Sequence, residues 1–483
     1  MSIKKKAMYN LTGRFVEFLF SIATPIILIR IFTQDNYGLY QQVLIIGSLI
    51  ASILSFNISQ NLYYFYPKAN NKEEQSIILS HTYFLLFLIA LISLFITLFI
   101  IPFLAQFIFP SYNFNNIYLL AFFVFFTILN RSFDNLFVVE GKEKIAMFYY
   151  SINKILRGVF LITATLQFNS SFYTLLSLSI YLFIVFLFFY IYLRYNYKIS
   201  PYKFDKKILR QQINYSLPFG FSGVLGTIGN YFDKIIITTF LPVRELAIYS
   251  VGTFRLPFIE LVYTSVGNVI LPEISRYSKD KDNGKIKAYN LWRKMIIKNI
   301  IITIPILFFS SFYSSMIITF IFGIDYYESS KVFRIIIWVF MFQMFGFGYI
   351  LRGFGITKPI LPANFVKVFL SVLLGLIFTY YWGYVGTAFS FIIAYASNAI
   401  IQLYFTKNFL KKTWIEFLPF LDILKVILCS VISLYLSYLV SFNNTILFYT
   451  LIKVCLVYFS CCYILLYKMS YLPSIFKIKS FLS

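Results

Sequence analysis

The chain has little that could bind a metal ion or carry acid–base chemistry. Its 483 residues include one histidine, four cysteines and 18 aspartate and glutamate residues. The histidine, His81, is far in sequence from the cysteines, and none of them has metal-ligand spacing to a histidine partner. All four cysteines fall in the last two apolar stretches, where they are ordinary helix residues: Cys429, Cys455, Cys461 and Cys462. These absences exclude a zinc or haem site, and we expect no cofactor.

Acidic residues are few compared with the 42 lysine and arginine residues, and the formal net charge is therefore +24. In a soluble protein such a charge would suggest nucleic acid. Here most basic residues lie in short loops between apolar stretches, and no basic stretch is interleaved with a polar aromatic platform. The positive-inside rule of membrane proteins accounts for this placement. We therefore expect no nucleic-acid partner.

Hydrophobic residues make up 60% of the chain, against roughly 45–50% in soluble domains. Apolar stretches of about 20 residues recur, and each can cross a bilayer. The first, at 15–32, is too long for a signal peptide and is expected to be retained. Helices satisfy their own backbone hydrogen bonds in lipid, which an open sheet cannot do, so we predict an all-α polytopic membrane protein of about 14 transmembrane helices. The predicted spans are 11–32, 42–62, 78–101, 117–139, 145–167, 172–193, 213–241, 247–271, 295–321, 332–351, 360–380, 385–405, 418–440 and 445–467.

The charges of the loops predict the orientation of these spans. With both termini in the cytoplasm, the most basic segments, 194–210 and 276–298, fall inside. The outside loops then carry only Arg244, Lys331 and Arg334. A miscounted helix would invert this asymmetry downstream of the error, so we expect an even number of spans and two cytoplasmic termini.

The second half of the chain weakly repeats the first. The turn after the first span, QDNYGLYQQV, matches VRELAIYSVG after the seventh, with Tyr40 opposite Tyr249, and Pro67 falls opposite Pro272. A duplicated six-helix unit is a recurrent transporter design. The expected parts are an N-terminal six-helix lobe at 1–200, a C-terminal six-helix lobe at 201–410, and two additional helices with a basic tail at 411–483.

One stretch carries a family resemblance: SLPFGFSGVLGTIGNYFDKIIITTFLPVRELAIYSVGTFRLP at 216–257, a Gly/Pro-rich helix with an N-x-x-D step and an A-I-Y-S-V turn. Its counterpart in the first half is DNYGLY. With these residues the whole chain resembles the Wzx-like polysaccharide and O-antigen flippases of the multidrug/oligosaccharidyl-lipid/polysaccharide exporter superfamily. Fourteen spans also resemble the lipid II flippases, in which two extra helices help form a groove for the lipid tail.

The resemblance implies what such a protein does. Members look like a V of two six-helix lobes around a central cavity that opens alternately to each side of the bacterial inner membrane. The implied cargo is an undecaprenyl-diphosphate-linked oligosaccharide of O-antigen, capsule or a similar repeat unit, moved by ion-coupled antiport. The implied partners are membrane lipid, a polymerase and other glycan-assembly proteins.

Two cations in the fifth span are the strongest candidates for binding the diphosphate. Lys154 and Arg157 lie about 14 and 18 Å from the cytoplasmic end of the span, near mid-membrane, and share one helix face. Two like charges about 6 Å apart repel by roughly 2–3 kcal/mol at an effective dielectric constant of 20. That span holds no carboxylate. Either another helix supplies one, with Glu260 as a candidate, or the missing anion is the substrate.

Other basic residues inside spans add to the anion-site candidates. Arg14 and Arg131 have carboxylates three residues away, Glu17 and Asp134, so a local ion pair explains each of them equally well. Three more candidates lie deeper in the chain: Arg255, Lys367 and Lys453. This surplus of positive charge favours a diphosphate over a cationic drug.

Acidic residues and glycines in the spans are candidates for coupling and for motion. Asp233 and Glu260 could bind a coupling Na+ or H+, and pairing across helices explains Asp233 equally well. The seventh span carries a stripe of glycines behind a proline, which indicates either close helix packing or a helix that bends during transport. The hinge candidates are Pro218, Gly220, Gly223 and Gly226.

Two other functions fit parts of the sequence. A membrane polysaccharide polymerase or glycosyltransferase would need a large outer loop or a carboxylate pocket, and the chain has neither. A multidrug exporter of the same superfamily would be expected to use acidic cavity residues. We therefore expect a transporter and not an enzyme.

Overall fold

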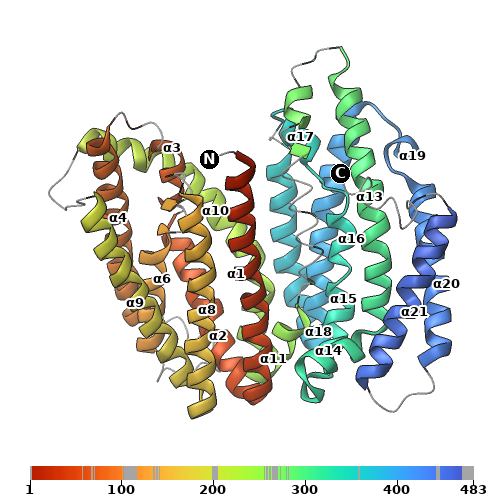
Figure 1. Cartoon of the computed structure of the whole chain (residues 1–483), viewed down its shortest axis with the longest axis horizontal. Coiled ribbons are helices and arrows are strands. Elements are labelled where there is room, and N and C mark those ends of the chain that lie inside the picture. The colour runs from red at the N-terminus through yellow and green to blue at the C-terminus, as the bar shows by residue number, and fades with distance from the viewer. Residues whose placement is uncertain are drawn as a thin grey trace. The chain divides into compact units, whose positions relative to one another are not determined.

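The computed structural model describes only helices and the segments that connect them (Figure 1). The chain divides into two compact units, Met1–Ala247 and Ile248–Ser483, called unit 1 and unit 2 below. The side chains of residues 3–14, and of some other helical residues, lie outside the description. The described residues are 3–471 except 57, 67–68, 70, 101, 103–116, 134–135, 138–139, 141, 198–204, 255, 257–258, 260–262, 264–269, 272, 279, 281, 357–358, 442–446 and 470.

The helices of unit 1 overlap the first seven predicted spans. They are α1 (Ile3–Ile31), α2 (Gln34–Leu54), η1 (Ile58–Asn61), α3 (Leu62–Phe65), α4 (Lys72–Phe95), η3 (Ile96–Ile100), α6 (Ile117–Asn130), α8 (Glu143–Phe168), α9 (Ser171–Tyr197) and α10 (Lys206–Phe240). The next helix, α11 (Val243–Gly252), crosses from unit 1 into unit 2. About half of the predicted eighth span lies outside the described residues.

Capping residues explain where three of these helices begin. The side chains of Thr33, Asn71 and Asp205 stand just before α2, α4 and α10, and each accepts a hydrogen bond from the backbone N–H three positions later. Such caps satisfy donors that the first turn of a helix leaves unpaired. The sequence thus sets these boundaries locally.

The repeated turn occupies the same structural position in both halves of the chain. Two residues separate α1 from α2, and two separate α10 from α11. Tyr40 and Tyr249 both fall in the second helix of their pair, and both are buried. The backbone breaks after the first and seventh predicted spans are therefore alike, as expected of a duplication.

Helices α1 and α8 lie side by side in unit 1 (Figure 1). Gly158 makes this approach close, because a Cβ there would stand 2.8 Å from Thr24 Oγ1. One turn earlier, Glu17 of α1 faces Lys154 of α8. Residue numbers rise together along both helices, so α1 and α8 run parallel.

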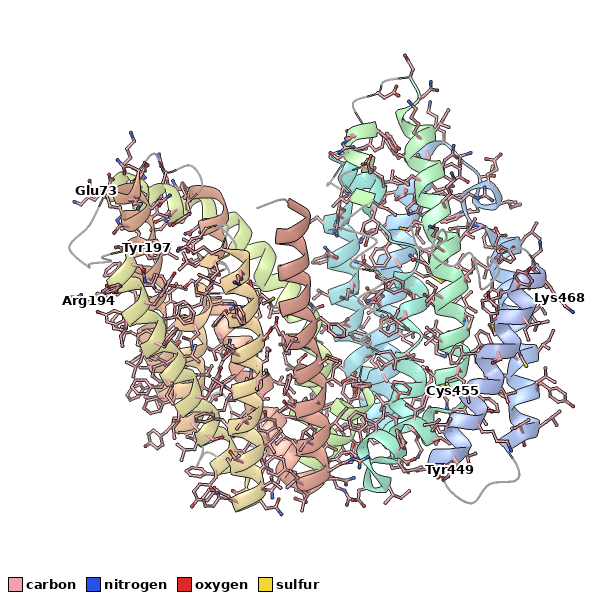
Figure 2. The ribbon with its side chains drawn as sticks, viewed as in Figure 1. Glu73, Arg194, Tyr197, Tyr449, Cys455 and Lys468 are labelled. Atoms are coloured by element: carbon pink, nitrogen blue, oxygen red, sulfur yellow. The ribbon has the colours of Figure 1, made fainter. Side chains whose placement is uncertain are left out.

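The C-terminal end of α9 lies beside the N-terminal end of α4 at one edge of unit 1. Ser76 of α4 donates a hydrogen bond to the Tyr197 carbonyl at 2.6 Å, and Figure 2 shows Tyr197 and Arg194 near Glu73. Inside this edge, the rings of Phe133 and Phe189 stack with centroids 3.9 Å apart. Aromatic packing therefore holds the segment that follows α6 against α9 here.

The helices of unit 2 overlap the predicted spans nine to fourteen. They are α13 (Gly284–Phe312), α14 (Ser314–Phe322), η5 (Ile324–Tyr326), α15 (Ser329–Ile336), α16 (Val339–Gln343), α17 (Tyr349–Gly353), α18 (Ile360–Leu410), α19 (Trp414–Phe417), α20 (Phe420–Ser441) and α21 (Leu447–Lys468). Figure 2 marks Tyr449 and Lys468 near the two ends of α21, with Cys455 between them.

Glycines reshape two regions that the sequence describes as simple spans. The tenth span, predicted as one helix at 332–351, is instead divided among α15, α16 and α17. Gly346 and Gly348, with φ of +53° and +84°, lie in the break between α16 and α17. Helix α18 holds two predicted spans, and Gly383, with φ of +58° and ψ of −145°, interrupts it between them. At 51 residues, α18 is far too long to cross a bilayer once.

The described helices confirm an all-α polytopic membrane protein. Seven of them are long and apolar enough to cross a membrane, by length and composition. Several of the other predicted spans coincide with helices that are shorter, more polar or broken, such as α6, α8 and α10. The count of fourteen spans and the division at 200 and 410 stay predictions.

Candidate functional site

Helix α8 places Lys154 and Arg157 one turn apart and leaves both half-buried. The Lys154 Nζ atom lies 3.6 Å from Glu17 Oε1 of α1, and these side chains are 27% and 22% exposed. From the sequence, another helix could have supplied a carboxylate to this pair of cations. Helix α1 supplies one to Lys154, which is Glu17. Glu260, the carboxylate considered for this role, lies outside the described residues.

Arg157 has a different environment. It interacts electrostatically with the hydroxyl groups of Tyr40 in α2 and Tyr181 in α9. Among the described side chains, no carboxylate lies within ion-pair distance of the Arg157 guanidinium. Together with Glu17 and Lys154, the group therefore keeps a net charge of about +1 at neutral pH.

The surroundings of Arg157 are held in place by hydrogen bonds between helices. The Tyr181 hydroxyl donates to the Asn153 backbone carbonyl at 2.7 Å and also contacts the Asn153 side-chain oxygen. The Asn153 amide in turn donates to the Tyr149 hydroxyl at 3.1 Å. The bond from Tyr181 fixes α9 against α8 beside the two cations, and the bond to Tyr149 lies within α8.

Arg131 serves the packing of unit 1. Its Nη1 donates to the Ala51 carbonyl at 2.8 Å and to Ser55 Oγ at 2.5 Å, and its Nη2 donates to Ser52 Oγ at 3.0 Å. These acceptors lie at the C-terminal end of α2, where unpaired carbonyl groups favour a cation. Asp134, its expected local partner, lies outside the described residues.

The hinge candidates all lie within one helix. Helix α10 runs from Lys206 to Phe240 without interruption and includes the four of them. At Gly220 a Cβ would stand 2.3 Å from the Phe56 ring, so this glycine permits close packing. The side chains at Pro218, Gly223 and Gly226 lie outside the description, and bending of α10 stays a prediction.

The remaining site candidates are scattered. Asp233 is half-buried on α10, and Lys453 is exposed on α21. Arg255, Glu260 and the side chain of Arg14 lie outside the described residues. In the part of the chain that the structure describes, no group of three or more His, Cys, Asp or Glu side chains could hold a metal ion.

Lys367 of α18 belongs to a polar group that the sequence reasoning missed. Its Nζ lies 5.1 Å from the centroid of the Tyr395 ring, and the Tyr395 hydroxyl accepts a hydrogen bond from Gln343 Nε2 at 3.0 Å. Asn398 Nδ2 donates to Asn364 Oδ1 at 2.9 Å. The sequence did contain a signal for this group, because Asn364 and Lys367 are three residues apart, as are Tyr395 and Asn398. The signal was weak because only Lys367 is charged.

An apolar groove of about 370 Å³ runs between α8 and α9. Its walls include Ile152 and Leu156 of α8 and Ile184 and Phe188 of α9. Ile152 and Leu156 precede and follow Lys154 on the same helix. One helix therefore contributes both to the cation pair and to an apolar surface.

A buried carboxylate lies in the connection between α6 and α8. The side chain of Glu140 is only 3% exposed, and its Oε2 lies 2.9 Å from Lys142 Nζ. Burial raises the pKa of Glu140, and the hydrogen bond and charge of Lys142 oppose this shift only in part. The Lys142 ammonium also lies near the hydroxyl groups of Tyr192 and Tyr197, at 3.5 and 3.4 Å.

Comparison with known proteins gives one family and several similar folds. The family described as "Polysaccharide biosynthesis protein" matches residues 3–278. The "Capsular polysaccharide biosynthesis protein CapF" of Staphylococcus aureus is 26% identical over 163 residues, which is 34% of this chain and 39% of that protein. This chain thus spans about two fifths of the length of that curated relative.

Two solved structures share the fold at low sequence identity. The lipid II flippase MurJ, in an inward closed conformation, has a TM-score of 0.73 and 17% identity, over 96% of this chain and 99% of that one. An inward-facing multidrug resistance MATE family transporter of the MOP superfamily has a TM-score of 0.63 and 14% identity, over 83% and 98%. At these identities the likeness shows the fold alone.

Proposed function

Because this chain belongs to the polysaccharide biosynthesis protein family, a Wzx-like family of transporters and not enzymes, we propose that it flips an undecaprenyl-diphosphate-linked oligosaccharide across the bacterial inner membrane. The cargo is the repeat unit of an O-antigen, a capsule or a similar glycan. Fourteen spans, with both termini in the cytoplasm, move the cargo by alternating access. Transport is coupled to Na+ or H+ through a residue such as Asp233.

The observation that carries this proposal is the uncompensated positive charge on α8. Placing an arginine at mid-membrane costs about 2.5–3.5 kcal/mol on insertion scales, so such residues are functional candidates. Arg157 incurs this cost without a carboxylate among the described side chains. A diphosphate offers the missing charge, at about 3 kcal/mol for each pair of opposite charges 5 Å apart at an effective dielectric constant of 20.

The chemistry around Arg157 suits phosphate oxygens. Its guanidinium can bind two phosphate oxygens at once, which an ammonium group cannot do. Tyr40 and Tyr181 are near enough to interact electrostatically with it. Lys154 adds a second charge, weakened by Glu17. Arg157 is therefore the main diphosphate ligand of this proposal, and Lys154 supports it.

The lipid tail needs an apolar path that stays open to the bilayer. The groove between α8 and α9 supplies apolar walls on the helix that also carries the cations. A charged head can then travel in a polar cavity while its tail remains in apolar surroundings. This arrangement supports a lipid-linked cargo over a free sugar.

Export in living cells tests the proposal. A strain that lacks this gene should accumulate complete repeat units on the carrier lipid at the cytoplasmic face, and the wild-type gene should restore export. Arg157→Ala should fail to restore it at normal abundance in the membrane. Lys144→Ala, which removes an exposed charge from the start of the same helix, is the matched control and should restore it.

Two results would contradict the proposal. Export of single repeat units that are never lengthened would indicate a polymerase. Normal glycan export in the deletion strain, together with a new sensitivity to cationic drugs, would indicate a multidrug exporter.

A further inference from the structure

The two halves of α18 present polar side chains to each other and to α16. Asn364 and Lys367 lie on the first half, and Tyr395 and Asn398 lie on the second, beyond Gly383. Gln343 of α16 joins them through its hydrogen bond to the Tyr395 hydroxyl. We call these five residues the amide face of unit 2.

Hydrogen bonds hold the amide face in one arrangement. Gln402 Nε2 donates to Asn398 Oδ1 at 2.8 Å, and Asn398 Nδ2 donates to Asn364 Oδ1 at 2.9 Å. Gln402 and Asn398 are buried, while Asn364 is exposed at the end of this chain of bonds. The buried amides therefore position an accessible one.

The amide face must border water or a ligand. Asn364 is exposed, and Gln343, Lys367 and Tyr395 are only half-buried. Amide and ammonium groups inside a membrane span avoid hydrocarbon, where each lost hydrogen bond costs several kcal/mol. Residues of this kind face the interior of the bundle or a wet cavity.

The chemistry of the amide face differs from that of the site on α8. Side-chain amides both donate and accept hydrogen bonds, as sugar hydroxyl groups do, and the Tyr395 ring adds a flat surface. A single lysine already placed over that ring lacks the two-pronged contact that the Arg157 guanidinium can offer to a diphosphate. The Lys367 ammonium also disfavours a cationic drug.

From these observations we infer that the amide face binds the sugar portion of the cargo. This inference rests on the proposed function, and it separates two contacts: α16 and α18 bind glycan hydroxyl groups, whereas the diphosphate binds at α8. The Asn364 amide, the Tyr395 ring and the Lys367 ammonium are the groups that contact the sugar. The glycan class that the protein accepts is then set in unit 2.

Binding of two lipids by the purified full-length protein tests this division. One probe is bare undecaprenyl diphosphate, and the other is the lipid-linked repeat unit extracted from the deletion strain. Wild-type protein should bind the second more tightly. Asn364→Leu and Gln343→Leu should each weaken binding of the glycosylated lipid by about three- to tenfold, the value of one or two lost hydrogen bonds.

Binding of the bare lipid serves as the folding control, because both variants should bind it like the wild type. Arg157→Ala should weaken binding of both lipids. If both leucine variants bind the glycosylated lipid like the wild type, the amide face serves packing only and the inference is wrong. Equal losses for both lipids in Lys367→Met would assign the face to the diphosphate and would also overturn it. If the wild type binds neither lipid, the proposed function itself fails.

Discussion

Replacing Lys154 and Arg157 by alanine, one at a time, should give two different defects although the residues are one turn apart. Lys154→Ala takes the ammonium group from its place 3.6 Å from Glu17. Arg157→Ala removes a guanidinium that interacts with tyrosine hydroxyl groups and, among the described side chains, with no carboxylate. The first change should lower stability, and the second should lower transport.

The size of the first effect follows from the geometry. Opposite charges 3.6 Å apart attract by about 4–5 kcal/mol at an effective dielectric constant of 20. Both side chains are about a quarter exposed, so solvent screens part of this attraction. Breaking a fully buried pair costs about 3–5 kcal/mol and a surface pair about 0–1, so we expect about 1–3 kcal/mol here.

Two measurements separate the defects. Thermal unfolding in detergent and abundance in the membrane report stability, and surface glycan reports transport. Lys154→Ala should unfold at a lower temperature and be less abundant, and the double variant Glu17→Gln, Lys154→Gln should recover most of the loss because no charge remains there. Arg157→Ala should keep its abundance and lose export, and Arg157→Lys should recover only part of the export.

Three results would contradict these expectations. If the double variant is no more stable than Lys154→Ala, the contact between α1 and α8 contributes no coupling energy. If Arg157→Ala loses abundance as severely as Lys154→Ala, Arg157 is a structural residue. Normal export in a double variant Lys154→Ala, Arg157→Ala would end the diphosphate assignment.

Three further predictions concern other regions. Gly220→Ala should destabilise the protein by about 1–3 kcal/mol through overpacking against Phe56, measured by thermal unfolding, and an unchanged unfolding temperature would contradict the close approach. Burial raises the pKa of Glu140 and so disfavours its ionised form in the folded state, and Glu140→Gln should therefore unfold at a higher temperature than the wild type above the native pKa; the difference should shrink as the pH falls from the native pKa to the ordinary glutamate pKa, and a constant difference would contradict it. In a cysteine-free background, Asp282→Cys should resist an impermeant thiol reagent in intact cells and react after lysis, and labelling before lysis would overturn the predicted orientation.

The positions of the helices could be read from the sequence because their causes are local. The length of an apolar stretch, a capping side chain such as Asn71 and the break before Tyr40 all act over a few residues. The predicted spans therefore match α9, α20 and α21 closely, whereas α1 and α4 begin several residues earlier than predicted. Family membership was predictable for the same reason, since the motif at 216–257 is contiguous.

The partners of the charged residues could not be read from the sequence because they depend on which helices meet and in what register. Arg131 had a local candidate partner, yet its described hydrogen bonds reach the end of α2, about 80 positions away along the chain. Lys154 lies beside Glu17, and this depends on Gly158 letting α8 approach α1. The amide face likewise exists only because α18 turns at Gly383 and brings Asn398 to Asn364.

The sequence by itself thus determined the fold class, the approximate spans and the surplus of basic residues, since composition and short-range pattern are sufficient for these. Only the tertiary structure decided which cations have partners: Lys154 beside a carboxylate and Arg157 beside two tyrosines. The physical reason is distance. An electrostatic contact or a hydrogen bond acts over a few ångströms, and packing alone brings within that range residues that the chain places more than a hundred positions apart.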